Sequence, residues 1–312
     1  MSPNLKSFWL IFGKGITIFC LCFSAVWFSP SYAQDSDREH YNAGIIFALQ
    51  GRFEKAEKEF QKGLESDNPF VTPLKAGLVI VKDVLDHKIK NETGIRIFKA
   101  TDWANKGELN KAIDEFTAAV KLDPEYYVTY NARGSVYFIK GMDDKALADF
   151  NQSIRCNPSY PKAYLNRAGI YGIKGMVSEA LADFNKALDL NPRYHEGFYN
   201  RGIFYSRNGE YENAVRDFSK AITLYSKYSS AYHSRAIAYG YLHKYHEALA
   251  DLNTVIELNP GNILVYYDKG LVCEKLGEKK DAIEAYQKFI QSAPFRLMER
   301  VNEARNRIDA LK

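Results

Sequence analysis

The chain has almost no excess of charge of either sign, and this absence excludes two kinds of partner. Its 312 residues carry 42 Lys and Arg against 38 Asp and Glu. Lys6 and Lys14 belong to the first 33 residues, which hold no acidic residue, so the rest of the chain has 40 basic and 38 acidic side chains. A nucleic-acid-binding chain usually shows a basic excess. We therefore expect no nucleic-acid partner and no charge-driven attachment to membranes.

The chain also lacks the short motifs that carry enzyme chemistry. It has no glycine loop ending in Gly-Lys-Ser or Gly-Lys-Thr, no nucleophile elbow, no HExxH helix and no CxxC pair. His243 and His246 are three positions apart, but no third ligand stands near them in the sequence, so we predict two surface histidines rather than a metal site. We expect no catalytic residue, no cofactor and no metal.

The first 33 residues differ from the rest of the chain. Lys6 and Lys14 precede the apolar run "ITIFCLCFSAVWF" at 16–28, and Ser31 and Ala33 then occupy the small-residue positions of an export cleavage site. This order predicts a signal peptide over 1–33, cleaved after Ala33, and export to the periplasm, the cell envelope or the medium. The alternative is an uncleaved N-terminal membrane anchor, for which the apolar run is short.

From residue 37 onward the sequence repeats with a period of 34 residues. We write it in rows that begin at 37, 93, 127, 161, 195, 229 and 263, and number the places within each row. The twentieth place is alanine in all seven rows, the eighth is glycine or alanine, and the twenty-fourth is aromatic in six rows. The residues at place eight are Gly44, Ala100, Gly134, Ala168, Gly202, Ala236 and Gly270, and those at place twenty-four are Phe60, Phe116, Phe150, Phe184, Phe218, Leu252 and Tyr286.

Each of these columns has a physical reason in an antiparallel pair of helices, each about 14 residues long. Small residues at places eight and twenty let the two helices approach closely, and the aromatic rings fill the space that remains. Six rows have glycine between the helices, where it adopts a left-handed conformation at little cost. Five rows have proline at place thirty-two, which predicts the end of the second helix because proline cannot continue it.

The pattern resembles the tetratricopeptide repeat family. The match gives one repeat at 37–70 and six more at 93–126, 127–160, 161–194, 195–228, 229–262 and 263–296. The resemblance implies an all-α fold, a right-handed α-solenoid of antiparallel helix pairs, whose first helices line a concave groove.

Three departures from the period carry information. Residues 71–92 are inserted between the first two rows, and the stripe Leu74, Leu78, Val81 and Leu85 predicts one added helix there. Row five has Ser226 in place of the proline. The tail 297–312 has Met298, Val301, Ala304, Ile308 and Leu311 on one face and Glu299, Arg300, Glu303, Arg307 and Asp309 on the other, which predicts a C-terminal capping helix.

Two further columns carry opposite charges. Place seven is basic in six rows, and place twenty-three is acidic in six rows. The basic residues are Lys99, Arg133, Arg167, Arg201, Arg235 and Lys269, and the acidic ones are Glu59, Glu115, Asp149, Asp183, Asp217 and Asp251. We predict a ladder of ion pairs along the solenoid, each worth about 0–1 kcal/mol if exposed. The alternative is that both columns are only solvated faces.

The resemblance also predicts which residues line the groove, because the family lines it from places two, five, nine, twelve and thirteen of each first helix. Rings beside small residues make pockets for a partner, although the same rings could serve only to pack the repeats. The candidates for partner binding are Asn131, Phe138, Lys162, Leu165, Tyr199, Arg207, His233, Tyr241 and Tyr267.

Two cysteines follow the predicted signal peptide. Cys156 and Cys273 lie four repeats apart in the array, too far for a disulfide, so we predict separate thiols that serve as packing residues.

These observations favour an exported, non-enzymatic scaffold that binds a protein or peptide in its groove. One alternative is a module that binds a glycan or another small ligand there. An enzyme would need a titratable pair such as Glu196 with His233. The sequence identifies neither the partner nor the oligomeric state.

Overall fold

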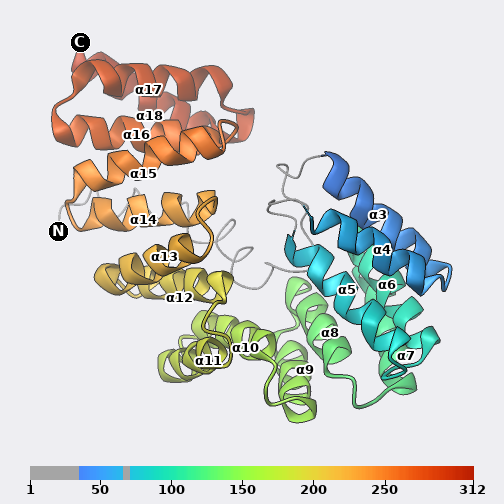
Figure 1. The fold of residues 1–312 in the computed structure, drawn as a ribbon. Coiled ribbons are helices and arrows are strands. Elements are labelled where there is room, and N and C mark those ends of the chain that lie inside the picture. The colour runs from blue at the N-terminus through green and yellow to red at the C-terminus, as the bar shows by residue number, and fades with distance from the viewer. Residues whose placement is uncertain (1–34, 66–70) are drawn as a thin grey trace. The chain divides into compact units, whose positions relative to one another are not determined.

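A computed structural model describes residues 35–65 and 71–312, which are helical almost throughout (Figure 1). They form two compact units, divided after Pro192. The helices of the first unit are α3 (Asp35–Leu49), α4 (Phe53–Gly63), α5 (Val71–Leu85), α6 (Asn91–Asn105), α7 (Leu109–Leu122), α8 (Tyr127–Ile139), α9 (Asp143–Cys156), α10 (Pro161–Ile173) and α11 (Val177–Leu190). Those of the second are α12 (His195–Arg207), α13 (Tyr211–Leu224), α14 (Ser229–Tyr241), α15 (Tyr245–Leu258), α16 (Ile263–Leu276), α17 (Lys279–Ser292), the 3-10 turn η1 (Phe295–Leu297) and α18 (Met298–Leu311).

Within each unit consecutive helices pack as antiparallel pairs, such as α8 with α9 and α12 with α13, and the predicted all-α fold is confirmed. The aromatic ring at place twenty-four is fully buried between the helices of its pair, as in Phe150 and Phe218. Glycine at place eight lies against that ring. A Cβ atom added at Gly134 would lie 2.8 Å from Phe150, and one added at Gly202 would lie 2.7 Å from Phe218. The small residue therefore sets how closely the helices approach.

The turn between the two helices of a row uses a left-handed residue. The six predicted turn glycines have φ between 70° and 79°. Row six has no glycine at this place, and His243 adopts φ 58° there instead. A residue with a Cβ is strained in this region, so His243 is an imperfect substitute for glycine.

The second helices end where the asparagine-proline and aspartate-proline pairs predict. Asp123, Asn157, Asn191 and Asn259 each directly follow the last residue of a helix. In row five α13 ends at Leu224, and Tyr225 has φ −144° and ψ 94°, close to the values at Asn157. Ser226 therefore leaves the end of the helix unchanged.

The added helix α5 lies within the range 71–92 in which one was expected. Leu74 and Val81 of the predicted stripe are fully buried, and Leu78 and Leu85 are partly buried. α5 packs against α4, and a Cβ atom added at its Gly77 would meet the Phe60 ring at 2.8 Å.

A polar contact fixes the C-terminal end of α5. Tyr126, the residue before α8, donates a hydrogen bond from its hydroxyl to Asp83 Oδ2 at 2.8 Å, and Lys88 Nζ donates to Asp83 Oδ1 at 3.0 Å. Tyr126 and Asp83 are both buried. α5 is therefore tied to the last residue of the second row, just before α8, as well as packed on the first row.

The last helix, α18, packs on α17 as a capping helix would, through Val301, Ala304 and Ile308. One prediction about its polar face is wrong: Arg300 is only 9% exposed, because its guanidinium lies over the Tyr267 ring, 5.7 Å from the centroid. Met298, predicted on the apolar face, is 40% exposed.

The predicted signal peptide falls outside the described residues. Within 35–65 and 71–312, no helix is long and apolar enough to cross a membrane.

Candidate partner-binding surface

The predicted ladder of ion pairs is present in five consecutive rows. In row two Lys99 Nζ lies 2.6 Å from Glu115 Oε1. In rows three to six the arginine at place seven donates two hydrogen bonds to the aspartate at place twenty-three, sixteen residues later. Arg133 reaches Asp149 with both distances 2.8 Å, and Arg235 reaches Asp251 at 2.8 and 2.7 Å. The remaining pairs are Arg167 with Asp183 and Arg201 with Asp217. The hydrogen bonds that Arg167 donates to Asp183 are the main reason that the pKa of Arg167 is raised.

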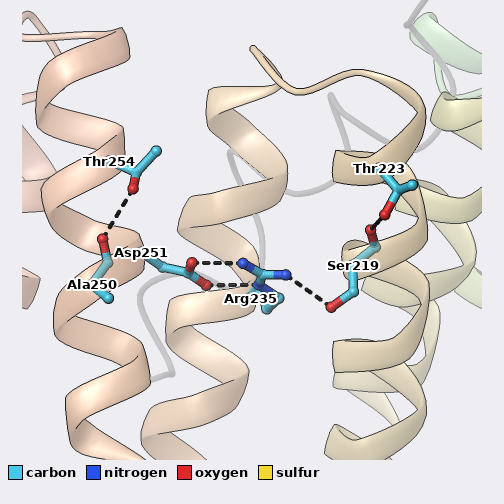
Figure 2. Close-up of polar contacts among 6 residues, drawn as sticks. All are labelled: Ser219, Thr223, Arg235, Ala250, Asp251 and Thr254. Atoms are coloured by element: carbon cyan, nitrogen blue, oxygen red, sulfur yellow. Dashed lines mark hydrogen bonds and ion pairs between the residues drawn. The ribbon is translucent and has the colours of Figure 1, made fainter.

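In three of the four rows with an arginine, the third guanidinium nitrogen links the row to the row before it. Arg235 Nη1 donates to Ser219 Oγ at 2.9 Å, and Figure 2 shows this arginine between Asp251 of α15 and Ser219 of α13. Arg133 makes the same kind of bond to Thr117, and Arg167 to Asn151. The side chains of these arginines are only 14–20% exposed, so they are structural groups and not a charged surface.

Two aromatic rings flank each of these arginines. The guanidinium carbon of Arg167 lies 5.6 Å from the Tyr164 ring centroid and 5.7 Å from that of Tyr171. The other three arginines have equivalent rings three residues before and four residues after them. Cation–π contacts of this kind stabilise the pair further.

A second polar ladder joins first helices of neighbouring rows. Asn166 Nδ2 donates to Asn131 Oδ1 at 2.9 Å. At the same two places, Ser234 donates to the Tyr199 hydroxyl at 3.4 Å, and His233 Nε2 lies 2.7 Å from Asp268 Oδ2. These contacts join place five of one row to place six of the next, so three of the predicted binding residues also connect repeats.

The nine predicted binding residues fall into two groups. Asn131, Phe138, Leu165, Tyr199 and Tyr267 are buried, with exposed fractions of 1–7%. Lys162, His233 and Tyr241 are partly exposed and Arg207 is exposed. Tyr241 stacks on Tyr211, with ring centroids 4.2 Å apart. The buried group is largely occupied by packing, and a contact between any of the nine and a partner stays a prediction.

The groups named for a possible enzyme have other neighbours. His233 faces Asp268, and Glu196 Oε2 lies 3.2 Å from His195 Nδ1. Within the described residues, no three His, Cys, Asp or Glu side chains gather to hold a metal ion.

Both cysteines that follow the predicted signal are free thiols, and burial raises the pKa of the Cys273 thiol to about 11. A protonated, buried thiol is unreactive, as expected of a packing residue.

The first unit contains a cavity of about 110 Å³. Its walls come from α5, from the first helices α3, α6 and α8, and from the start of α10; none of its lining residues belongs to α7, α9 or α11. It therefore lies on the side of the first helices that faces away from their second helices, which we call the first-helix face. The lining is mostly apolar and includes Val79, Ile80, Ile97 and Phe98.

Sequence reasoning found only part of this cavity. It named Asn131 and Lys162 from their places in the repeat, and both line it. It missed Ala76 and Val79 of α5, because only the stripe that packs α5 on α4 was recognised. Val79 is 44% exposed although it is large and apolar. In the sequence, its apolar side chain next to that stripe was the feature that could have pointed to a second apolar face of α5.

The fold defines a class of protein: a helical-repeat protein built from consecutive antiparallel helix pairs. Family models for the tetratricopeptide repeat match residues 40–69, 127–160, 161–194, 195–228 and 233–296. The chain belongs to the tetratricopeptide repeat family. No curated protein matches it.

Several solved structures share the fold. PilW, described as a widely conserved type IV pilus biogenesis factor, is 18% identical with a TM-score of 0.61, over 68% of this chain and 97% of its own. A tetratricopeptide repeat protein from Parabacteroides merdae is 20% identical with a TM-score of 0.51, over 89% and 99%. YrrB, described as having an unusual peptide-binding site, is 22% identical with a TM-score of 0.50, over 61% and 97%. At these identities the likeness shows the fold alone.

Proposed function

We propose that this chain is a non-enzymatic scaffold that binds a peptide or an extended segment of a protein on its first-helix face. The apolar cavity between α5, α6 and α8 carries the proposal. Tetratricopeptide repeat proteins generally bind protein or peptide partners, and the similar structure of YrrB is described as a peptide-binding one.

The distribution of polar groups supports the same function. The arginines and aspartates of the four regular rows bind one another, and their charge is not available for substrate chemistry. The cavity offers apolar surface, which favours a peptide side chain over a glycan, because a glycan site needs polar groups beside its aromatic rings.

We further propose that the protein works in the cell envelope or outside the cell. The basic start, the apolar run and the small residues before position 34 support this location. Amino-terminal sequencing of the protein recovered from the envelope of its host tests it. A mature chain that begins at Gln34 would support cleavage of the signal peptide. An intact amino terminus in the membrane fraction would instead support an uncleaved membrane anchor.

Site-specific cross-linking tests the scaffold function. A photoreactive phenylalanine analogue is placed at Val79 or at Arg207, on the first helices or α5, and in matched variants at the exposed Lys186 of α11 or Glu257 of α15. In the host envelope we expect one discrete adduct from a first-helix position and none from the second-helix positions. Equal adducts from all four sites, or adducts only from α11 and α15, would contradict a partner on the first-helix face.

A further inference from the structure

Two tyrosine rings lie face to face where row five meets row six. Tyr211 is the first residue of α13, and Tyr241 is the last residue of α14. We propose that this pair is an oxidative cross-linking site, at which hydrogen peroxide and a haem peroxidase join the two rings through a carbon–carbon bond. The cross-link modifies the chain itself and does not depend on the proposed binding function.

The arrangement of the two rings suits this bond. The ring centroids of Tyr211 and Tyr241 are 4.2 Å apart, and the ring planes are 11° from parallel. By contrast, Tyr127 and Tyr160 meet at 64°, with the edge of one ring against the other. In a stack the ring carbons of one side chain face those of the other, whereas an edge contact is made by ring hydrogens. The stack therefore brings carbon atoms of Tyr211 and Tyr241 close enough to react.

The two hydroxyl groups lie at the same end of the stack. Burial raises the pKa of the Tyr241 hydroxyl, and the neighbouring Tyr211 hydroxyl raises it further, because two phenolates held close together would repel one another. The Cε carbons next to the hydroxyls are then at the same end as well. The unpaired electron of a tyrosyl radical is shared between the oxygen and these carbons, so they are the atoms that form the bond.

The coupling removes two hydrogen atoms from the pair. Each tyrosine first gives the hydrogen atom of its hydroxyl to the oxidised haem of the peroxidase, which leaves two tyrosyl radicals. One Cε carbon of each ring then bonds to the other, and the hydrogen that each of these carbons carried moves to the oxygen to restore the hydroxyl. In total two C–H bonds break and one C–C bond forms, and the two electrons and two protons reduce one hydrogen peroxide to two waters.

The surroundings of the pair favour this outcome over other oxidations. Tyr211 and Tyr241 are both partly exposed at the ends of their helices. Rows five and six, residues 195–262, contain no cysteine and no methionine, which are the side chains whose oxidation competes. A radical formed on the stack therefore has its partner ring as its neighbour and no thiol or thioether within either row.

The cross-link would fasten one row to the next. α13 and α14 pack against each other, and Tyr211 and Tyr241 are thirty positions apart in the sequence. A covalent bond that closes such a loop restricts the unfolded chain and so stabilises the folded one. The expected consequence is a second unit that resists unfolding after oxidation.

Peroxidase treatment of the full chain, followed by peptide mapping, tests the inference. The chain is treated at low concentration with hydrogen peroxide and a haem peroxidase, and the monomer is isolated. A parallel reaction with free tyrosine verifies that the oxidant forms dityrosine. Trypsin cleavage after Lys and Arg places Tyr211 in the peptide 208–216 and Tyr241 in the peptide 236–244. Mass spectrometry then detects whether these two peptides are joined.

Two variants assign the bond to the stack. Tyr241→Phe keeps the ring and removes the hydroxyl. Tyr239→Phe is the matched control, because Tyr239 lies in the same tryptic peptide but its ring contacts the guanidinium of Arg235. Circular dichroism verifies that both variants are folded.

We expect wild type to give the joined peptides, with a mass two hydrogen atoms below their sum, together with dityrosine fluorescence. Tyr241→Phe should lose the joined product, and Tyr239→Phe should keep it. The oxidised monomer of wild type should unfold at a higher urea concentration than the untreated chain, and Tyr241→Phe should show no such shift.

Three results would overturn the inference. The first is the absence of the joined peptides from wild type while free tyrosine is coupled in the parallel reaction. The second is a joined product that survives Tyr241→Phe and disappears with Tyr239→Phe, because the bond would then come from a ring outside the stack. The third is joined peptides in covalent dimers alone, which would mean coupling between chains.

Discussion

The four rows from 127 to 262 and the region around α5 use helices of similar length in opposite ways. In the four rows every arginine at place seven finds its aspartate, and the aromatic or leucine side chain at place twenty-four is buried against a small residue. Around α5 the period is broken, a cavity remains between helices, and a large apolar side chain is exposed beside it. In the regular rows the chain's own groups satisfy one another, whereas the irregular helix leaves apolar surface uncovered. We propose that a partner binds at this surface.

The strongest test of this comparison removes one member of an ion pair. Asp183→Ala leaves the guanidinium of Arg167 largely buried without its carboxylate, and we expect a loss of about 2–4 kcal/mol in the free energy of unfolding. Urea unfolding followed by circular dichroism measures it. The exposed pair of Lys174 with Asp144 is the control, since Asp144→Ala should cost less than about 1 kcal/mol. Equal losses from Asp183→Ala and Asp144→Ala would show that the ion pairs of the ladder contribute no more to stability than an exposed ion pair does.

The next test concerns the small residue at place eight. Gly202→Ala puts a Cβ atom 2.7 Å from the Phe218 ring, and the strain should cost about 1–3 kcal/mol. Gly240→Ala is the matched control in α14, because nothing lies within 4 Å of its Cβ position. It should instead stabilise the protein by up to about 1 kcal/mol through helix propensity. Two changes of the same sign in thermal or urea unfolding would contradict the packing explanation.

A third test asks how firmly α5 is held. Tyr126→Phe removes the hydroxyl that donates to Asp83, and a hydrogen bond to a charged group is worth about 1.5–3 kcal/mol. We expect a loss near the lower end of that range and faster amide hydrogen exchange in α5. Tyr137→Phe, on the helix α8 that Tyr126 directly precedes, is the control. Unchanged exchange in α5 would mean that its packing on α4 alone holds it.

The smallest expected effect compares two turns. Gly175 has φ 74° and open space around it, so Gly175→Ala should lose about 1 kcal/mol through the backbone alone. His243→Gly should gain up to about 1 kcal/mol, since His243 adopts φ 58° where other rows have glycine. Both changes are measured by thermal unfolding. A loss on His243→Gly would indicate that its contact with the Tyr245 hydroxyl, at 2.8 Å, outweighs the strain.

The sequence predicts the regular rows well because their causes are local or periodic. The columns of glycine, alanine, phenylalanine, arginine and aspartate identify the helix pairs, the turns and the ion pairs, since each depends on residues a fixed distance apart. Arg300 was misplaced because its partner Tyr267 comes from a different helix, outside the pattern of α18 itself.

The candidate site was predicted less completely. The side chain at place five of one row contacts the side chain at place six of the next row. Asn131 is therefore hydrogen-bonded to Asn166, and His233 to Asp268, across the boundary between rows. The pattern within a single row does not reveal this contact. The cavity depends on where α5 lies against α6 and α8, and that placement follows from long-range packing that no column records.

The central claim is that the partner binds at the cavity beside α5 and that the regular rows are structural. Methyl NMR of the isoleucine-labelled chain, during titration with a peptide selected on the full chain from a random displayed library, tests it most directly. We predict shifts at Ile80 and Ile97, which line the cavity, and none at Ile256 of α15. Shifts at Ile256 without any at Ile80 or Ile97 would contradict the claim and move the binding surface to the regular rows.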